Sequence, residues 1–265
     1  MKNFSFFKNR RNNASGEIRV NQMAEILGAR INPKSGYEKD ICIYVKECPR
    51  EFVPENTYMD IVDQTYFIPW LLEHPFVKVI SLSRIAQEYI SKILNRKDVI
   101  LLPQHHCNYL RESRNREEVK TVGIIGSPEC GSIYFGLVDR LKDIGLDIIV
   151  RRNPRRRSQV VDFYKSIDIQ VAYRPQITEV DNNMLTSLKL VNASSFGVPT
   201  VAYPEKSYVD EFDGCFLPAY SEDDLFLNIK RLKEEPLLYA ELLGKAKERT
   251  EKYHIENIVE LYKQL

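Results

Sequence analysis

The stretch Ser187-Leu188-Lys189-Leu190-Val191-Asn192-Ala193-Ser194-Ser195-Phe196-Gly197-Val198-Pro199-Thr200-Val201-Ala202 decides the fold of this chain. Its apolar residues recur at helical spacing, then a glycine interrupts the pattern, and a β-branched run follows. The pattern predicts a helix over 185–196, a stop at Gly197 and a buried strand over 200–203. A helix that runs directly into a strand is the repeating unit of α/β proteins.

The same helix carries polar residues that suit a ligand. Lys189, Asn192 and Phe196 are spaced to share one face. The predicted core face consists of Leu188, Val191 and Ser195. Free backbone N–H groups and the positive dipole end at a helix N-terminus favour an anion, and Thr186 and Ser187 are candidates to cap the helix or to bind an oxyanion. The alternative interpretation is a surface lysine and a helix-facing asparagine.

Strand-like and helix-like segments alternate along the rest of the chain, which predicts an α/β fold with parallel sheets. The predicted strands are 4–8, 41–45, 58–62, 77–81, 99–103, 121–126, 146–150, 169–173 and 200–203. The predicted helices are 18–27, 84–94, 133–141, 160–166, 185–196, 222–233 and 236 to the end. Gly28 is predicted to end the first of these helices, and Ser83 is predicted to cap the second.

A charged segment without apolar residues, 111–118, separates two such series and predicts a linker. We therefore expect an N-terminal α/β domain over 1–110 and a C-terminal α/β domain over 119–265. Ligands of open parallel sheets lie beyond the C-terminal strand ends, and clefts between domains are favoured sites. The sequence thus predicts a small-ligand site in a cleft between the two domains.

Composition excludes several classes of protein. Of 265 residues, 43% are hydrophobic and 28% are charged, which is typical of a globular protein and excludes a disordered or collagen-like chain. With 38 basic and 37 acidic residues the net charge is +1, which argues against a dedicated nucleic-acid binder. The apolar runs are too short for a membrane span or a secretory signal. Five cysteines without a Cys-x-x-Cys pair predict free, buried thiols and a cytoplasmic location.

The second half resembles the nucleotide-sugar-binding domain of GT-B glycosyltransferases of the group 1, family 4-like type. The family pattern K-L-x-E-x-x-x-x-G-x-P is matched in spacing by Lys189, Leu190, Gly197, Val198 and Pro199. In the first half, residues 16–28 are loosely similar to the first loop and helix of such enzymes. There is one departure, because the family's ribose-binding Glu falls at Asn192, and an amide lacks the carboxylate that accepts from two hydroxyls.

The resemblance implies a fold, an activity and a set of partners. It implies two Rossmann-like domains with parallel sheets facing across a cleft, the first on the acceptor side, with the final helix crossing back to it. It implies a glycosyltransferase that moves a sugar from a UDP- or GDP-linked donor, as co-substrate, to a hydroxyl of a saccharide or glycan precursor. No cofactor and no metal are implied, because fixed positive charges stabilise the leaving diphosphate.

The resemblance and the strand ends together nominate site residues. The expected catalytic residues are Lys189 and Arg151 at the diphosphate and Asp63 as the base of an inverting transfer. The expected donor- or substrate-binding residues are Gly16, Arg19, His106, Gly126, Ser127, Arg152, Tyr173, Arg174, Ser187, Leu188 and Asn192. Structural alternatives stay open at each, including a solvated basic loop for Arg151 and Arg152, a capping residue for Asp63 and packing for His106.

The adjacent histidines do not predict a metal site. His105 and His106 are adjacent on an extended chain, where their side chains point to opposite faces, so a shared metal is not expected. Two alternative functions stay open. A glycosyltransferase acting on nucleic acid is motivated by the five arginines within 151–157. A non-catalytic nucleotide-sugar-binding or scaffold subunit is motivated by Asn192 and by the short first domain.

Overall fold

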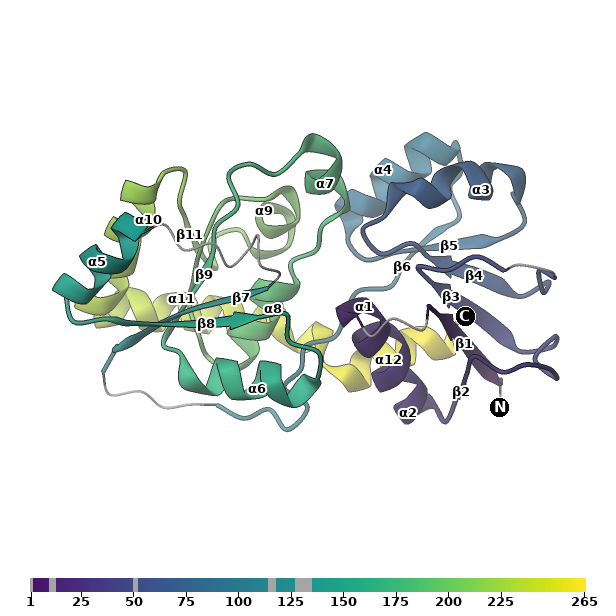
Figure 1. Ribbon diagram of the computed structural model, residues 1–265, viewed down its shortest axis with the longest axis horizontal. Helices are drawn as coiled ribbons and strands as arrows, with labels where there is room; N and C mark the ends of the chain where they lie inside the picture. Colours follow the sequence, from purple (N-terminus) through teal and green to yellow (C-terminus); the bar gives the residue numbers. More distant parts are fainter. Residues whose placement is uncertain (1, 10–12, 50–51, 114–117, 127–134) are drawn as a thin grey trace. The chain divides into compact units, whose positions relative to one another are not determined.

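The computed structural model describes residues 2–9, 13–49, 52–113, 118–126 and 135–265 (Figure 1). The chain forms two compact units. The first comprises Met1–His105, Glu179–Thr186 and Ile255–Leu265, and the second comprises His106–Thr178 and Ser187–His254. Residues 114–117 of the predicted linker lie outside the described residues, as does Cys130.

The first unit contains a parallel sheet with the strand order β2-β1-β3-β4-β5-β6. Its strands are β1 (Phe4–Lys8), β2 (Arg30–Ile31), β3 (Ile41–Val45), β4 (Thr57–Asp60), β5 (Lys78–Ser81) and β6 (Val99–Leu101). All five residues of β3 are buried, as expected for a central strand covered on both faces. The short strand β2 was not predicted, because two exposed residues carry no apolar periodicity.

Helices cover both faces of this sheet (Figure 1). One layer contains η2 (Thr65–Phe67), α3 (Ile68–Glu73), α4 (Arg84–Leu94) and α7 (Glu179–Met184). The other contains α1 (Ala14–Gly16), the π-helix η1 (Glu17–Gln22), α2 (Met23–Leu27) and α12 (Ile255–Lys263). Ser83 caps α4 by accepting from the N–H of Ala86 at 3.2 Å, and Gly28 ends α2 at a φ of 62°, so both predicted boundaries are confirmed.

The second unit contains a five-stranded parallel sheet with the order β11-β10-β9-β7-β8. Its strands are β7 (Thr121–Gly126), β8 (Asp147–Arg152), β9 (Ile169–Ala172), β10 (Thr200–Ala202) and β11 (Leu217–Pro218). Its helices are α5 (Phe135–Asp143), α6 (Arg157–Ser166), α8 (Leu188–Ser195), α9 (Lys206–Phe212), α10 (Glu222–Glu234), α11 (Pro236–Thr250) and the 3-10 helix η3 (Glu251–Tyr253). The α/β class with parallel sheets is therefore confirmed.

Hydrophobic cores pack against both faces of the second sheet. The core beneath α5 and α10 contains Leu141 and Ile229, and the opposite core beneath α6 contains Phe163 and Ile167. Gly123 in the middle of β7 makes the second contact possible, since a Cβ there would lie 2.5 Å from the Ile167 side chain. A strand glycine of this kind marks close approach of a neighbouring element.

The helix predicted over 185–196, which is α8 in the structure, differs from its prediction in two ways. The predicted helix 185–196 is shorter, and α8 starts only at Leu188, while α7 precedes it as a separate helix. The predicted core face of Leu188, Val191 and Ser195 is wrong at two positions, because Leu188 and Ser195 are half-buried. Leu190, Ala193 and Phe196 are buried instead, since α8 is packed on several sides rather than along one stripe. Gly197 ends the segment at a φ of 68°, as predicted.

The thiols and the helices agree with two further expectations. Cys42, Cys107 and Cys215 are buried, Cys48 is half-buried, and all four are free. Burial raises the pKa of the Cys107 thiol to about 12, so it stays protonated at neutral pH. Within the described part of the chain, no helix has the length and apolar character needed to cross a bilayer.

Candidate functional site

The two sheets share one topology. In each, the first strand lies between the second and the third, so the direction of chain winding reverses beside it. Open α/β sheets bind ligands beyond the C-terminal strand ends at this reversal. The reversals lie between β1 and β3 in the first unit and between β7 and β9 in the second. These two sheet edges are the candidate sites.

In the second unit, an ion pair joins the ends of neighbouring strands. Arg174 follows β9 and Glu205 follows β10; Arg174 Nε donates to Glu205 Oε1 at 2.8 Å and Nη2 donates to Oε2 at 2.6 Å. Glu205 is fully buried, whereas the Arg174 side chain keeps 23% exposure. Burial raises the pKa of Glu205 above its ordinary value, and the charges of Arg174 and Lys189 offset part of that rise. The sequence nominated Arg174, but its pairing with Glu205 was not predicted.

Lys189 is placed beside this pair by the first turn of α8. The Lys189 carbonyl accepts from Gln170 Nε2 at 3.1 Å, and the same amide nitrogen donates to Thr200 Oγ1 at 3.1 Å. Tyr164 OH donates to Gln170 Oε1 at 2.6 Å, which fixes the amide orientation. These buried hydrogen bonds fasten α8 to β9 and β10, so the half-buried Lys189 side chain is held near the strand ends.

Ser187 does not cap α8 with its side chain, so that part of the prediction is wrong. Its hydroxyl donates instead to a carboxylate oxygen of Glu211 on α9. Burial raises the pKa of Glu211, and hydrogen bonds from Ser187 and Tyr253 hold part of that rise back. The contact fixes the start of α8, and Leu188 lies half-buried just after it.

Asn192 has a hydrogen-bond partner that its local sequence does not predict. Its Oδ1 accepts from the backbone N–H of Cys107 at 2.8 Å, and Asn192 is only 7% exposed. Arg157 Nη1 donates to the Cys107 carbonyl at 2.9 Å, so both backbone groups of this residue are bonded. An amide oxygen serves an N–H donor without placing a charge in the interior. The departure from the family pattern at Asn192 therefore coincides with a buried structural hydrogen bond.

Other nominated residues lie along the same edge of the second sheet. Tyr173 follows β9, its ring meets Tyr203 edge-on at 6.2 Å, and its hydroxyl donates to the Tyr220 carbonyl at 3.3 Å. Arg151 and Arg152 end the edge strand β8 and are exposed. Gly126 ends β7 with a φ of 151°, and its carbonyl accepts from the N–H of Asn153 at 2.8 Å. Ser127 lies outside the described residues.

In the first unit, Arg19 is not where the sequence predicted. It is fully buried, and its Nε donates to Asp60 Oδ2 at 2.6 Å while its Nη1 donates to the Pro103 carbonyl at 2.9 Å. The guanidinium also lies 5.5 Å from the Tyr262 ring. Arg19 is thus the ion-pair partner of Asp60 in the interior of the first unit, and a binding role for it stays a prediction. Gly16 is buried as well, and its N–H donates to Asn13 Oδ1 at 2.7 Å.

Asp63 follows β4 and keeps 40% exposure. Its Oδ1 pairs with Lys46 Nζ at 2.5 Å. The preceding residue, Val62, is buried at a φ of 57°, a conformation that a β-branched residue rarely adopts. Such strain costs on the order of 1–3 kcal/mol and clusters at functional sites. The strand end that carries Asp63 is therefore held in an unusual conformation.

His106 is buried in the second unit. Its backbone N–H donates to the Tyr253 carbonyl at 3.0 Å, and its ring meets that of His254 edge-on at 5.2 Å. His106 lines a cavity of about 660 Å³ with Arg111, Lys247 and Glu251. His105 belongs to the first unit and lies 3.2 Å from the Ile18 carbonyl through Nε2. Among the residues that the structure describes, no cluster of three or more histidine, cysteine or acidic side chains is arranged to hold a metal.

The fold is the GT-B fold, with two α/β units that each contain a parallel sheet. A scan of protein-family models and a search of curated proteins found no match to the sequence. Among solved structures, the chain resembles HepE from Anabaena, crystallised with UDP and glucose, at a TM-score of 0.65 and 10% identity, covering 100% of this chain and 98% of that one.

Two more structures extend the comparison. WaaG, a glycosyltransferase involved in lipopolysaccharide biosynthesis, gives a TM-score of 0.62 at 9% identity, with 97% of both chains covered. TarM gives 0.57 at 16% identity, with 86% of this chain covered. This chain spans about half of TarM, 54% of its length. At these identities the likeness concerns the fold.

Proposed function

We propose that the protein is a glycosyltransferase that moves a sugar from a nucleotide-sugar donor to a hydroxyl of a saccharide or glycan precursor. The observation that carries the proposal is the charged edge of the second sheet, where Lys189, Arg174 and Glu205 meet beside the β7–β9 reversal. Positive groups at such an edge suit a diphosphate, and the start of α8 adds backbone N–H donors. The crystallised complex of HepE with UDP and glucose supports the choice of donor class.

The charged residues of the two sheet edges take different roles in the proposed reaction. Lys189 and one of Arg151 and Arg152 contact the diphosphate and stabilise the charge that develops on it as the glycosidic bond breaks. Arg174, which stays partly exposed, contacts the donor, and the buried carboxylate of Glu205 holds its guanidinium in place. Asp63, freed from Lys46, takes the acceptor proton if the transfer inverts configuration. Fixed charges replace a metal in this mechanism, and the reaction takes place in the cytoplasm.

The proposal is tested by calorimetry with UDP and GDP, followed by transfer assays with their glucose and mannose esters in EDTA. We expect one diphosphate to bind and its sugar ester to turn over. A ligand at 100 times its dissociation constant adds about 2.7 kcal/mol of stability, so binding also raises the melting temperature. Failure of both diphosphates to bind at millimolar concentration contradicts the proposal. Tight binding without hydrolysis or transfer supports a scaffold subunit instead.

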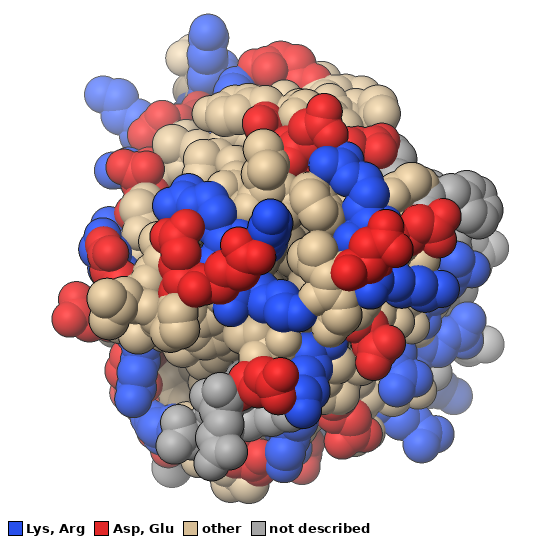
Figure 2. Space-filling model, turned by 90° about the vertical axis from the view of Figure 1, so that its left-hand side faces the viewer, with Lys and Arg blue, Asp and Glu red and all other residues tan. Residues whose placement is uncertain are grey.

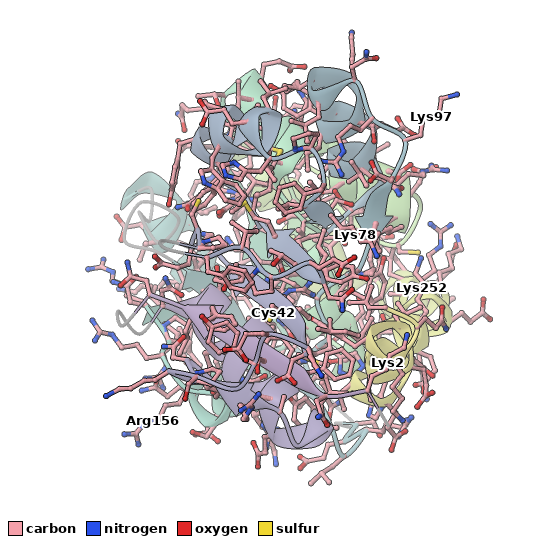
Figure 3. The ribbon with its side chains drawn as sticks, turned by 90° about the vertical axis from the view of Figure 1, so that its right-hand side faces the viewer. Lys2, Cys42, Lys78, Lys97, Arg156 and Lys252 are labelled. Atoms are coloured by element: carbon pink, nitrogen blue, oxygen red, sulfur yellow. The ribbon has the colours of Figure 1, made fainter. Side chains whose placement is uncertain are left out.

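The nucleic-acid alternative receives little support. Figure 3 shows Arg156, within the arginine-rich stretch, projecting away from the molecule. The face in Figure 2 carries Lys and Arg interspersed with Asp and Glu rather than a field of one sign. A nucleic-acid site needs a continuous basic surface to neutralise phosphates. We retain a saccharide as the acceptor because the net charge of the whole chain is only +1, whereas nucleic-acid binders carry a basic excess.

A further inference from the structure

The first unit contains a large cavity that none of the nominated residues lines. It measures about 740 Å³, within the range typical of small-ligand sites. Its walls come from the C-terminal ends of β1, β2 and β3 and the loops that follow them. It therefore lies at the strand reversal of the first sheet, where α/β sheets bind ligands. In Figure 3, Cys42 marks β3, which pairs with β1 in this sheet.

One wall of the cavity is aromatic. Phe7 stacks on Tyr44 with ring centroids 4.3 Å apart and an interplanar angle of 8°, and Tyr37 meets Phe7 edge-on at 5.0 Å. Tyr44 is buried, so it backs the wall, while Phe7 and Tyr37 are half-buried at its surface. Phe52 adds a ring that is 54% exposed. Fixed aromatic surfaces suit a ligand with a flat apolar face.

The other lining residues form a rim of Lys8, Glu47, Asn9 and Asn32 with balanced charge, together with Pro33, Cys48 and Pro49. Lys8 and Glu47 are the charged residues among the cavity's lining residues, and their charges cancel. Asn9 and Asn32 add amide groups. Asn32 is held in place because its Oδ1 accepts from the Lys8 N–H at 2.9 Å and its Nδ2 donates to the Lys8 carbonyl at 3.1 Å. A balanced polar rim gives no net attraction to a phosphate but supplies donors and acceptors for hydroxyls.

We propose that this cavity binds an uncharged saccharide, with a sugar ring stacked on the wall of Phe7, Tyr37 and Phe52 and its hydroxyls bonded to the rim. A pyranose presents C–H groups on its faces and hydroxyls around its edge, which matches this combination of surfaces. The naming of this saccharide as the acceptor rests on the proposed function, whereas its binding to the cavity does not.

The test measures binding of maltotriose, cellotriose and chitotriose to the full-length protein by saturation-transfer NMR and calorimetry, without any nucleotide. Phe52→Ala and Tyr37→Ala are the test variants. Phe76→Ala is the matched control, because Phe76 is 55% exposed in the same unit but does not line the cavity. We expect one trisaccharide to bind, with about tenfold weaker affinity in each test variant and unchanged affinity in the control. Circular dichroism checks that every variant is folded.

Three outcomes overturn the proposal. No trisaccharide binds at millimolar concentration; or Phe76→Ala weakens binding as much as Phe52→Ala; or UDP, rather than a sugar, loses affinity in Phe52→Ala, which makes the wall a nucleobase site. Failure of the proposed function gives a different pattern. In that case neither diphosphate binds the second unit, while the trisaccharide still depends on Phe52 and Tyr37.

Discussion

The same strand order supports two different sheet edges in this molecule. At the reversal of the first sheet the lining is aromatic and its charges cancel, and the main ion pair of that unit, Arg19–Asp60, is fully buried. At the reversal of the second sheet the ion pair Arg174–Glu205 stays partly exposed beside Lys189. The comparison teaches that topology places a site, whereas the side chains at the strand ends decide what it binds.

The largest effect is expected from the buried ion pair of the first unit. Asp60→Ala leaves the Arg19 guanidinium buried without its carboxylate, which should lower the free energy of unfolding by about 3–5 kcal/mol. Chemical denaturation measures it. The surface pair Arg140–Asp223 is the control, because Asp223→Ala should cost less than about 1 kcal/mol. Equal losses in the two variants would contradict a structural role for Arg19.

The ion pair Arg174–Glu205 should make the stability of an Arg174 variant depend on pH. Arg174→Gln removes the nearest charge that holds down the pKa of Glu205, so that pKa rises further above its ordinary value of 4.5. A raised carboxyl pKa means that the folded state keeps a proton the unfolded state has lost, so stability falls as pH rises through this window. The variant should lose about 3 kcal/mol at pH 8 and little near pH 5. In the double variant with Glu205→Gln, the stability loss should no longer depend on pH. If the pH dependence of the loss persists, a group other than Glu205 is responsible.

Lys189→Ala separates binding from stability. Loss of a charge-assisted contact to a diphosphate oxygen should weaken donor binding by about 1.5–3 kcal/mol, a ten- to hundredfold effect. The melting temperature without ligand should fall only modestly, because the Lys189 carbonyl still accepts from Gln170, although the ammonium no longer offsets the raised pKa of Glu205. Calorimetry with the diphosphate measures the effect. Saccharide binding to the first unit should be unchanged, and unchanged donor affinity would remove Lys189 from the site.

The smallest effect concerns the backbone after α8. Gly197 has a φ of 68°, so Gly197→Ala should cost about 1 kcal/mol even though a Cβ would meet open space. Gly244 lies inside α11 and also faces open space, so Gly244→Ala should stabilise by about 0.5–1 kcal/mol. Thermal unfolding compares the two. The same sign for both changes would show that conformation at Gly197 is not the cause.

Local sequence predicts much of the fold. The strands β1, β3 and β7 match their predicted bounds, because most of their residues are buried and apolar. The helix α4 also matches, since a serine cap and an amphipathic pattern mark its ends. The short α9 and β11 were missed because too few residues carry a period.

The site was only partly predictable, because its contacts join residues that are far apart in sequence. Asn192 bonds to Cys107, and Arg19 pairs with Asp60, yet neither partner carries a local signal for the other. The aromatic wall likewise arises from Phe7, Tyr37 and Tyr44, which lie on different segments. The position of a residue after a strand predicts that it lies near the C-terminal edge of the sheet, where ligands bind. Whether its side chain is exposed there depends on tertiary packing, which the local sequence does not show.

The helix α12 has a consequence for how the protein is made. Tyr262 on this helix lies against Arg19, and Tyr58 OH donates to the Leu265 carbonyl at 3.1 Å, so residues 255–265 complete the unit that residues 1–105 begin. A ribosome therefore synthesises the whole second unit before the first can close. During that interval the first sheet lacks part of its cover, and its apolar surface stays open to chaperones and to aggregation. The first unit, although its synthesis starts first, therefore completes its fold after the second unit has been synthesised.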